Sequence, residues 1–156
     1  MLPKKHERET DNKLNDASLL YKKGEYDQCL HLLETIDNTY NLSRQINLKL
    51  MCYVMQGKNN CTYECAKKYF ESNKEDLTSL GFLICFAENE NERNNYKNCL
   101  LNFKVKNDED YYRVATIALE CGLYEFALEN FELALDVEGL DYELYLLAAS
   151  AAAGAK

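Results

Sequence analysis

The feature that most limits the fold is a pair of helix-period patterns separated by one glycine, within residues 108–141. In the first pattern, apolar residues recur at the three- and four-residue spacing of one helix face, at Tyr111, Val114, Ala115 and Ala118. Gly122 interrupts this pattern, and a second apolar face follows at Ala127, Phe131, Ala134 and Leu135. Ala115 and Ala127 fall where two helices would come closest, and a large aromatic residue beside each would fill the remaining space. The segment therefore predicts a helical hairpin.

The hairpin resembles one tetratricopeptide (TPR) repeat. The TPR pattern of aromatic, small and glycine positions is matched at Tyr111, Val114, Ala115, Ala118, Gly122, Tyr124, Ala127, Phe131 and Ala134. The proline that ends the pattern is replaced by Gly139, which can end a helix through a left-handed cap. The resemblance implies an all-α fold, a right-handed superhelix (α-solenoid) of TPR-like helix-turn-helix repeats.

The same pattern can be followed along most of the chain at a period of about 34 residues. We predict a flexible N-terminal tail and a repeat domain over 10–156, divided as follows: tail 1–9, repeats near 10–42, 43–73, 74–107 and 108–141, and a partial repeat over 142–156. The partial repeat begins a first helix and has no second one, and its apolar residues lack the polar outer face of a terminal cap. We expect the chain to be a fragment of a longer protein.

The repeat boundaries come from local signals. In the first repeat, Gly24 takes the position of Gly122, and Asp37 and Asn38 end the second helix. Ser43 is a plausible N-cap for the next helix. The following turn is lengthened by residues 58–61, after which Thr62 can cap the second helix of that repeat. The polar run over 88–95 in the third repeat is either a loop or an extended helix end.

Composition excludes several functions. The formal net charge is -8, and an acidic chain repels phosphate backbones, so we expect no direct contact with nucleic acid. The apolar run near the C-terminus is shorter than the roughly 20 residues of a membrane span, so we expect no membrane partner.

Cysteine usage bears on the cellular compartment. The chain has seven cysteines, most of them on apolar faces of the predicted helices, at Cys29, Cys52, Cys85, Cys99 and Cys121. A buried free cysteine behaves as a small hydrophobic residue. The N-terminus is charged and lacks the apolar run of a secretory signal. We therefore expect reduced thiols and a cytoplasmic or nuclear protein.

Residues for catalysis are scarce. His6 falls in the predicted tail, and His31 is followed by Leu32 and Leu33, which favours a half-exposed structural role. No phosphate-binding glycine loop or nucleophile motif is present. Cys61 and Cys65 could share a helix face, but a zinc site needs about four ligands and no second pair accompanies them. We expect no enzyme activity, no metal and no cofactor.

The TPR resemblance implies a site for a protein or peptide partner, because the first helix of each repeat lines a concave surface. The residues that would form this groove are Leu14, Asn15, Ser18, Asn47, Met51, Ser79, Phe82, Phe86, Tyr112, Arg113 and Thr116. Tyr21, Leu48 and Thr78 share these faces. If the alignment of this chain to the repeat pattern is shifted by one residue, some of these side chains, Phe86 and Leu48 especially, would lie in the core instead. The aromatic content of the set favours binding.

Two interpretations of function remain. The first is a scaffold, a TPR subunit or fragment of a multiprotein assembly that resembles those of the anaphase-promoting complex or the signal recognition particle, with possible self-association. The second is an adaptor or co-chaperone that binds a partner peptide in its concave groove. The basic clamp of co-chaperone TPR domains is poorly matched, since Leu14, Ser18 and Glu75 occupy its positions. We favour the scaffold.

Overall fold

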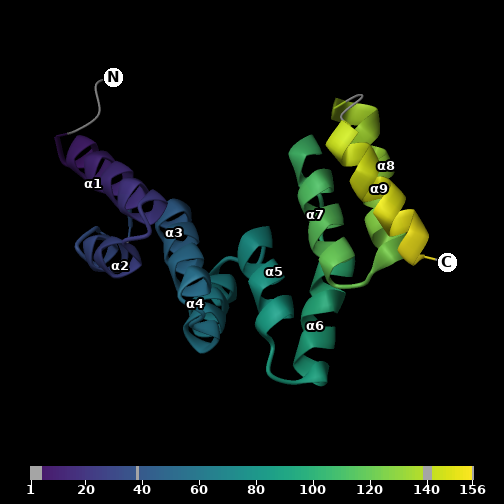
Figure 1. The fold of residues 1–156 in the computed structure, drawn as a ribbon, viewed down its shortest axis with the longest axis horizontal. Helices are drawn as coiled ribbons and strands as arrows, with labels where there is room; N and C mark the ends of the chain where they lie inside the picture. The colour runs from purple at the N-terminus through teal and green to yellow at the C-terminus, as the bar shows by residue number, and fades with distance from the viewer. Residues whose placement is uncertain (1–4, 38, 139–141, 156) are drawn as a thin grey trace. The chain divides into compact units, whose positions relative to one another are not determined.

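The protein is all-α. The computed structural model describes residues 5–37, 39–138 and 142–155, and every regular element within these residues is an α-helix. The helices are α1 (Lys5–Lys22), α2 (Tyr26–Glu34), α3 (Leu42–Met55), α4 (Asn59–Ser72), α5 (Leu77–Phe86), α6 (Glu90–Leu101), α7 (Asp108–Glu120), α8 (Tyr124–Glu138) and α9 (Tyr142–Gly154) (Figure 1). Among the described residues, no helix is both long and apolar enough to cross a membrane. The predicted fold class is confirmed at the level of helices; the superhelix stays a prediction.

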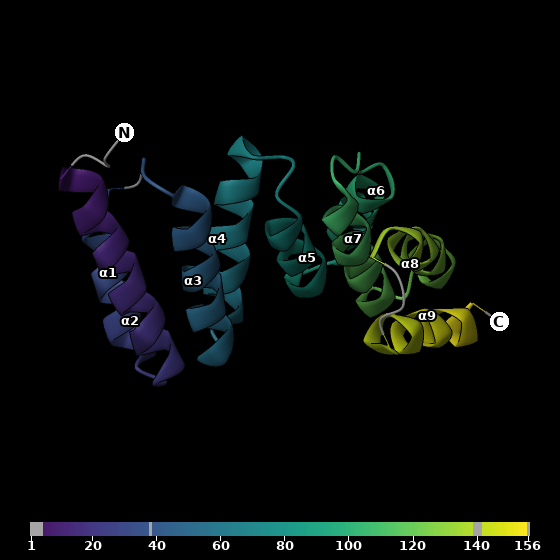
Figure 2. The same cartoon turned by 90° about the horizontal axis from the view of Figure 1, so that it is seen from above.

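The chain divides into two compact units, Met1–Lys74 and Glu75–Lys156. In the first unit, α1 packs on α2 and α3 packs on α4, and α3 also contacts both helices of the preceding pair. Helices α3 and α4 overlap in Figure 1 and stand side by side in Figure 2. One buried cluster joins the two pairs, made of Leu14, Ala17, Cys29, Leu33, Ile36 and Cys52. The first unit is therefore two helical hairpins that share a core.

The second unit contains the hairpin from which the sequence argument started. Helix α7 packs on α8, and α9 also packs on α8. Ala115 and Ala127 are both fully buried, as is Phe131. The Tyr112 ring meets the Phe131 ring edge-on, with centroids 6.3 Å apart. Helix α5 pairs with α6 and also contacts α7. The predicted hairpin over 108–141 is confirmed for the described part of that range; Gly139 lies outside it.

Glycines close the connections α1–α2, α3–α4 and α7–α8 in the same way. Gly24, Gly57 and Gly122 follow the first helix of each pair and have φ angles of 80°, 66° and 75°. Each glycine amide donates to the carbonyl three residues earlier, and the next amide donates to the carbonyl five residues earlier, at N···O distances of 2.9–3.1 Å. This is a Schellman turn, which satisfies the last carbonyls of a helix and reverses the chain. A residue without a Cβ is favoured there because φ is positive.

The α5–α6 connection has no glycine and is closed by a side chain instead. Ala87 follows α5 with ψ 132°, so the backbone leaves the helix in an extended direction. Arg93, from the first turns of α6, donates from Nε to the carbonyl of Ile84 (3.2 Å) and from a terminal nitrogen to that of Ala87 (3.1 Å). Its guanidinium also pairs with Glu90 at 3.1 Å. Arg93 thus satisfies the carbonyls at the end of α5, as the backbone amides of a glycine turn do for the first helix of the other hairpins.

The structure moves three of the predicted boundaries. Helix α1 begins at Lys5, so residues 5–9 of the predicted tail are helical, and residues 1–4 lie outside the described part. Asn41, and not Ser43, precedes α3, with a left-handed backbone (φ 47°). Helix α4 begins at Asn59, so residues 58–61 do not lengthen the turn. Thr62 lies inside α4, where its hydroxyl donates to the carbonyl of Lys58.

Two other boundary predictions have a mixed outcome. Helix α2 ends at Glu34, just before the predicted break at Asp37, while Asn38 lies outside the described residues. The polar run over 88–95 is both loop and helix. Glu88 and Asn89 connect the two helices, the Asn89 side chain accepts from the amide of Glu92 (2.9 Å), and α6 takes the rest.

Gly57→Ala tests the glycine turns. A Cβ built at Gly57 would meet no atom within 4 Å, so the whole cost is that of holding alanine at positive φ. We expect the free energy of unfolding, measured with urea, to fall by about 1–2 kcal/mol. Gly81→Ala is the matched control, since Gly81 lies inside α5, where alanine is favoured over glycine by about 0.5–1 kcal/mol. Equal stability of Gly57→Ala and the wild type would contradict this assignment.

Arg93→Ala tests the arginine closure. Loss of the bonds to the Ile84 and Ala87 carbonyls leaves those groups with weaker partners, and we expect a loss of about 1–3 kcal/mol in the free energy of unfolding. Arg93→Lys keeps the charge without the planar fork, and we expect its free energy of unfolding to lie between those of the wild type and Arg93→Ala. Lys97→Ala, one turn later on α6, serves as the control. If Arg93→Ala and Lys97→Ala have the same small effect, the α5 carbonyls do not depend on Arg93.

Candidate functional site

The second unit contains an open groove between α5 and α7. Its volume is about 290 Å³, and its lining is mostly apolar. The lining residues are Thr78, Gly81, Phe82 and Cys85 from α5 and Tyr112, Arg113, Thr116, Ile117 and Glu120 from α7. On each helix these residues recur at three- and four-residue spacing and so form one face. The groove is therefore the space between two facing helix surfaces.

The position of α5 is fixed by its cap and its buried face. Asp76 accepts a hydrogen bond from the amide of Ser79 at 2.7 Å, a standard N-cap. The face of α5 that lies opposite the groove is buried. Its residues are each at most 2% exposed: Leu77, Leu80, Leu83 and Ile84. Gly81 has no side chain where α5 faces α7, and a Cβ there would lie 3.4 Å from Ile117. The absence of a side chain at Gly81 deepens the floor of the groove.

Aromatic rings form the walls. Phe82 and Phe86 stack with centroids 6.2 Å apart and an interplanar angle of 17°. Tyr112 rests against buried Phe131, so its ring is held by the core of the α7–α8 hairpin. Rings that are held in place before binding cost a partner less ordering entropy. The walls are suited to apolar side chains.

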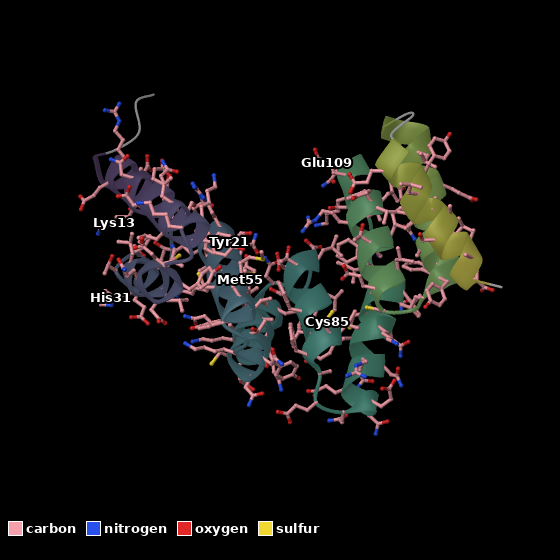
Figure 3. The ribbon with its side chains drawn as sticks, viewed as in Figure 1. Lys13, Tyr21, His31, Met55, Cys85 and Glu109 are labelled. Atoms are coloured by element: carbon pink, nitrogen blue, oxygen red, sulfur yellow. The ribbon has the colours of Figure 1, made fainter. Side chains whose placement is uncertain are left out.

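The two ends of the groove differ in charge. At one end, Arg113 donates to the hydroxyl of Thr78 on α5 (3.0 Å) and lies 3.6 Å from the carboxylate of Asp110. At the other end, Glu120 forms no ion pair with any described residue. Cys85 projects from α5 toward α7 near this end (Figure 3). A segment bound along the groove would meet a cation at one end and an anion at the other.

The predicted groove residues are brought together only in part. Phe82, Tyr112, Arg113 and Thr116 line the groove, and Phe86 stacks beside it. Gly81, Cys85, Ile117 and Glu120 were not predicted, although they continue the same helix faces one turn further. Ser79 is a correction: it is fully buried, because it lies one helix turn before buried Leu83 and shares the core-facing side of α5.

The residues predicted on the first unit have varied surroundings. Leu14 is a correction, since it is fully buried in the shared core and cannot contact a partner. Asn15 is exposed and Ser18 is half-buried, and Arg44 from α3 donates to both, at 2.9 and 3.2 Å.

The other two predicted residues of this unit lie on α3. Asn47 is half-buried, and Met51 is 40% exposed. Leu48, for which a core position was the alternative, packs against the buried cluster of the first unit.

The cysteines are free, but their exposure differs from the expectation. Cys29 and Cys52 are buried, whereas Cys85 and Cys99 are exposed. Burial, together with a hydrogen bond to Cys29, raises the pKa of the Cys52 thiol to about 12. Burial also raises the pKa of Cys121 to about 12, with a contribution from nearby Cys85. At neutral pH these two thiols are therefore fully protonated and weak nucleophiles.

Metal ligands do not gather within the described residues, where no three His, Cys, Asp or Glu side chains are placed to hold an ion. His31, expected to be half-exposed, points away from α2 into solvent with its side chain 84% exposed, 3.8 Å from Glu34 (Figure 3). The expected absence of catalysis stays a prediction.

No protein-family model, curated protein or solved structure matches this chain.

Thiol alkylation by iodoacetamide at pH 8 tests the cysteine environments. We expect Cys61 and Cys99, both exposed, to react first in peptide mass spectrometry. Cys29 and Cys52 should react only as fast as the first unit opens, because they are inaccessible and burial raises the pKa of both thiols. Added urea should remove the difference. Modification of Cys52 as fast as Cys99 in native buffer would contradict the buried core.

Proposed function

We propose that this protein is a TPR-like scaffold, a subunit or fragment of a multiprotein assembly, and that it binds a protein segment in the groove between α5 and α7. The single observation that carries the proposal is the groove itself. Four residues predicted from the sequence to contact a partner line this one cavity, whose floor is apolar: Phe82, Tyr112, Arg113 and Thr116. The aromatic walls of this groove are half-buried, and aromatic side chains around a central apolar pocket are typical of protein-binding hot spots.

The helical hairpins support the TPR-like part of the proposal. Successive hairpins, each with a short turn after its first helix, are the unit from which right-handed superhelical arrays are built. The small residues at the hairpin contact, Ala115 and Ala127, are buried as the TPR pattern requires. A cytoplasmic or nuclear location without membrane or nucleic-acid contact belongs to the same proposal and is supported by the acidic composition.

Self-association is a further part of the scaffold proposal. Helix α9 exposes Tyr145 (48%) and Leu146 (52%), and α8 exposes Leu133 (45%). Exposed apolar side chains on adjacent helices favour contact with another protein surface or a second copy.

The second candidate is an adaptor that takes a short peptide. The different charges at the two ends of the groove favour it, because they would fix the direction of a bound segment. A co-chaperone of the carboxylate-clamp type is less well supported, since Leu14, at one clamp position, is buried in the core.

Phe82→Ala combined with Tyr112→Ala tests the groove. Partners are first captured from source cells by cross-linking mass spectrometry, and their binding to the purified chain is then measured by calorimetry. We expect the double variant to bind at least tenfold more weakly, since the two rings supply most of the apolar wall. Leu19→Ala combined with Met55→Ala removes exposed apolar side chains from the first unit and is the matched control.

The readout must separate binding from folding, because Tyr112 also packs on Phe131. Far-ultraviolet circular dichroism and the melting temperature of each variant provide this separation, and Phe82→Ala alone leaves the Tyr112–Phe131 contact intact. An unchanged affinity for both the single and the double variant would remove the groove as the binding site.

A further inference from the structure

A second cavity lies within the first unit, between α3 and α4, and is separate from the proposed partner groove. Its volume is about 350 Å³, at the small end of the range for ligand pockets. It is lined by Leu42, Ile46, Lys49 and Tyr53 from α3 and by Cys65, Lys68, Tyr69 and Ser72 from α4. Each set recurs at three- and four-residue spacing, so each forms one helix face.

The cavity combines an apolar body with hydrogen-bond donors. Leu42 and Ile46 contribute aliphatic surface at one side. The Tyr69 hydroxyl accepts a hydrogen bond from Asn73 at 3.1 Å, which leaves its own proton to donate. In the described part of the chain, the Tyr53 hydroxyl has no hydrogen-bond partner. The polar groups at the wall are therefore ready to donate to an acceptor.

Two ammonium groups add positive charge. Lys49 is half-buried and Lys68 is exposed, and neither forms an ion pair with any residue that the structure describes. Both act electrostatically on the Cys65 thiol, which places them around the same cavity. Two other lysines of this unit are engaged, Lys58 with Asp27 at 3.7 Å and Lys74 over the Phe70 ring. Lys49 and Lys68 thus stand unneutralised in a chain of net charge -8.

The cavity supplies no anion of its own. No carboxylate is among its lining residues. Burial raises the pKa of the Cys65 thiol more than the two lysines lower it, so the thiol stays protonated at pH 7. Burial also raises the pKa of the Tyr53 hydroxyl, which keeps its proton as well. The other residues that line the cavity are therefore neutral. The Glu34 carboxylate, which is not among them, also raises the pKa of Tyr53.

We propose that this cavity binds an organic anion, a carboxylate carried on an apolar body. The carboxylate would lie between Lys49 and Lys68 and accept from the tyrosine hydroxyls, and the apolar body would rest on Leu42 and Ile46. Charge-assisted hydrogen bonds from two ammonium groups suit a carboxylate, and the aliphatic wall suits an aromatic or branched body. A free organic acid and the carboxyl terminus of a peptide with an apolar last residue both have this chemistry.

The experiment compares 2-naphthoate with the neutral 2-naphthamide on the full wild-type chain, by ligand-observed nuclear magnetic resonance titration. The two probes have the same apolar body and differ in charge. We expect naphthoate to bind at least tenfold more tightly, and added salt to weaken naphthoate alone. This comparison needs no variant, so it stands whether or not a substitution affects folding. Equal affinity for the two probes would overturn the proposal.

The site is then located with variants. Lys49→Met combined with Lys68→Met keeps the aliphatic stems and removes both charges, and we expect at least a tenfold loss of naphthoate affinity. Lys22→Met combined with Lys23→Met makes the same change of net charge at the exposed end of α1 and should leave affinity unchanged. An equal loss in both double variants would mean that naphthoate responds to net charge, and would overturn the assignment to this cavity.

A third comparison distinguishes the two sources of the ligand. A tetrapeptide ending in phenylalanine is titrated as the free acid and as the C-terminal amide. If the free-acid peptide competes with naphthoate and the amide does not, the natural ligand is a peptide terminus. If neither peptide competes while naphthoate binds through Lys49 and Lys68, the ligand is a free organic acid.

Discussion

The architecture depends on how the first helix of each hairpin ends. The last carbonyls of a helix have no partner within it, and a helix that reverses direction within a few residues must supply partners at once. Gly24, Gly57 and Gly122 do this through backbone amides, which requires a positive φ. Where the α5–α6 connection lacks glycine, Arg93 brings its guanidinium from the second helix to the same kind of carbonyl. Two different chemical solutions thus satisfy one constraint, and each holds two helices antiparallel so that their apolar faces meet.

Features set by spacing could be predicted from the sequence. Ala115, Ala127 and Phe131 recur at helix period around Gly122, and all three are buried at the hairpin contact. The glycine turn and the all-α class follow from the same pattern. A groove was predicted along the first helix of every repeat, and Phe82 and Tyr112 do line the one between α5 and α7.

Features set by tertiary contacts could not be predicted so well. Leu14 and Ser79 were placed on an outward face by alignment, but a rotation of one residue about a helix axis, about 100°, moves a side chain from groove to core. Asn41 takes the left-handed region that asparagine tolerates, and no local signal separates it from Ser43 as a cap. Residues 5–9 carry too few apolar residues to predict a helix from periodicity, yet α1 includes them.

Overall charge hides local chemistry in this chain. The net charge of -8 led to the expectation of no direct contact with nucleic acid, and it says nothing of where the cations lie. Lys49 and Lys68 face one cavity with no acid in its lining, while Arg113 is already engaged by Asp110 and Thr78 at the end of the groove. We therefore propose a site for an anion in the first unit and an apolar groove for a protein segment in the second.

Backbone nuclear magnetic resonance of the full chain tests the account most directly. The account predicts helical Cα shifts that break at Gly24, Gly57 and Gly122, coupling constants of positive φ at these glycines, and slow amide exchange at each glycine and the residue after it. It also predicts extended shifts at Ala87 and a slowly exchanging Arg93 Nε proton. Helical shifts that continue through the glycines, or fast exchange at all six turn amides, would contradict the closure of these hairpins and the groove that depends on it.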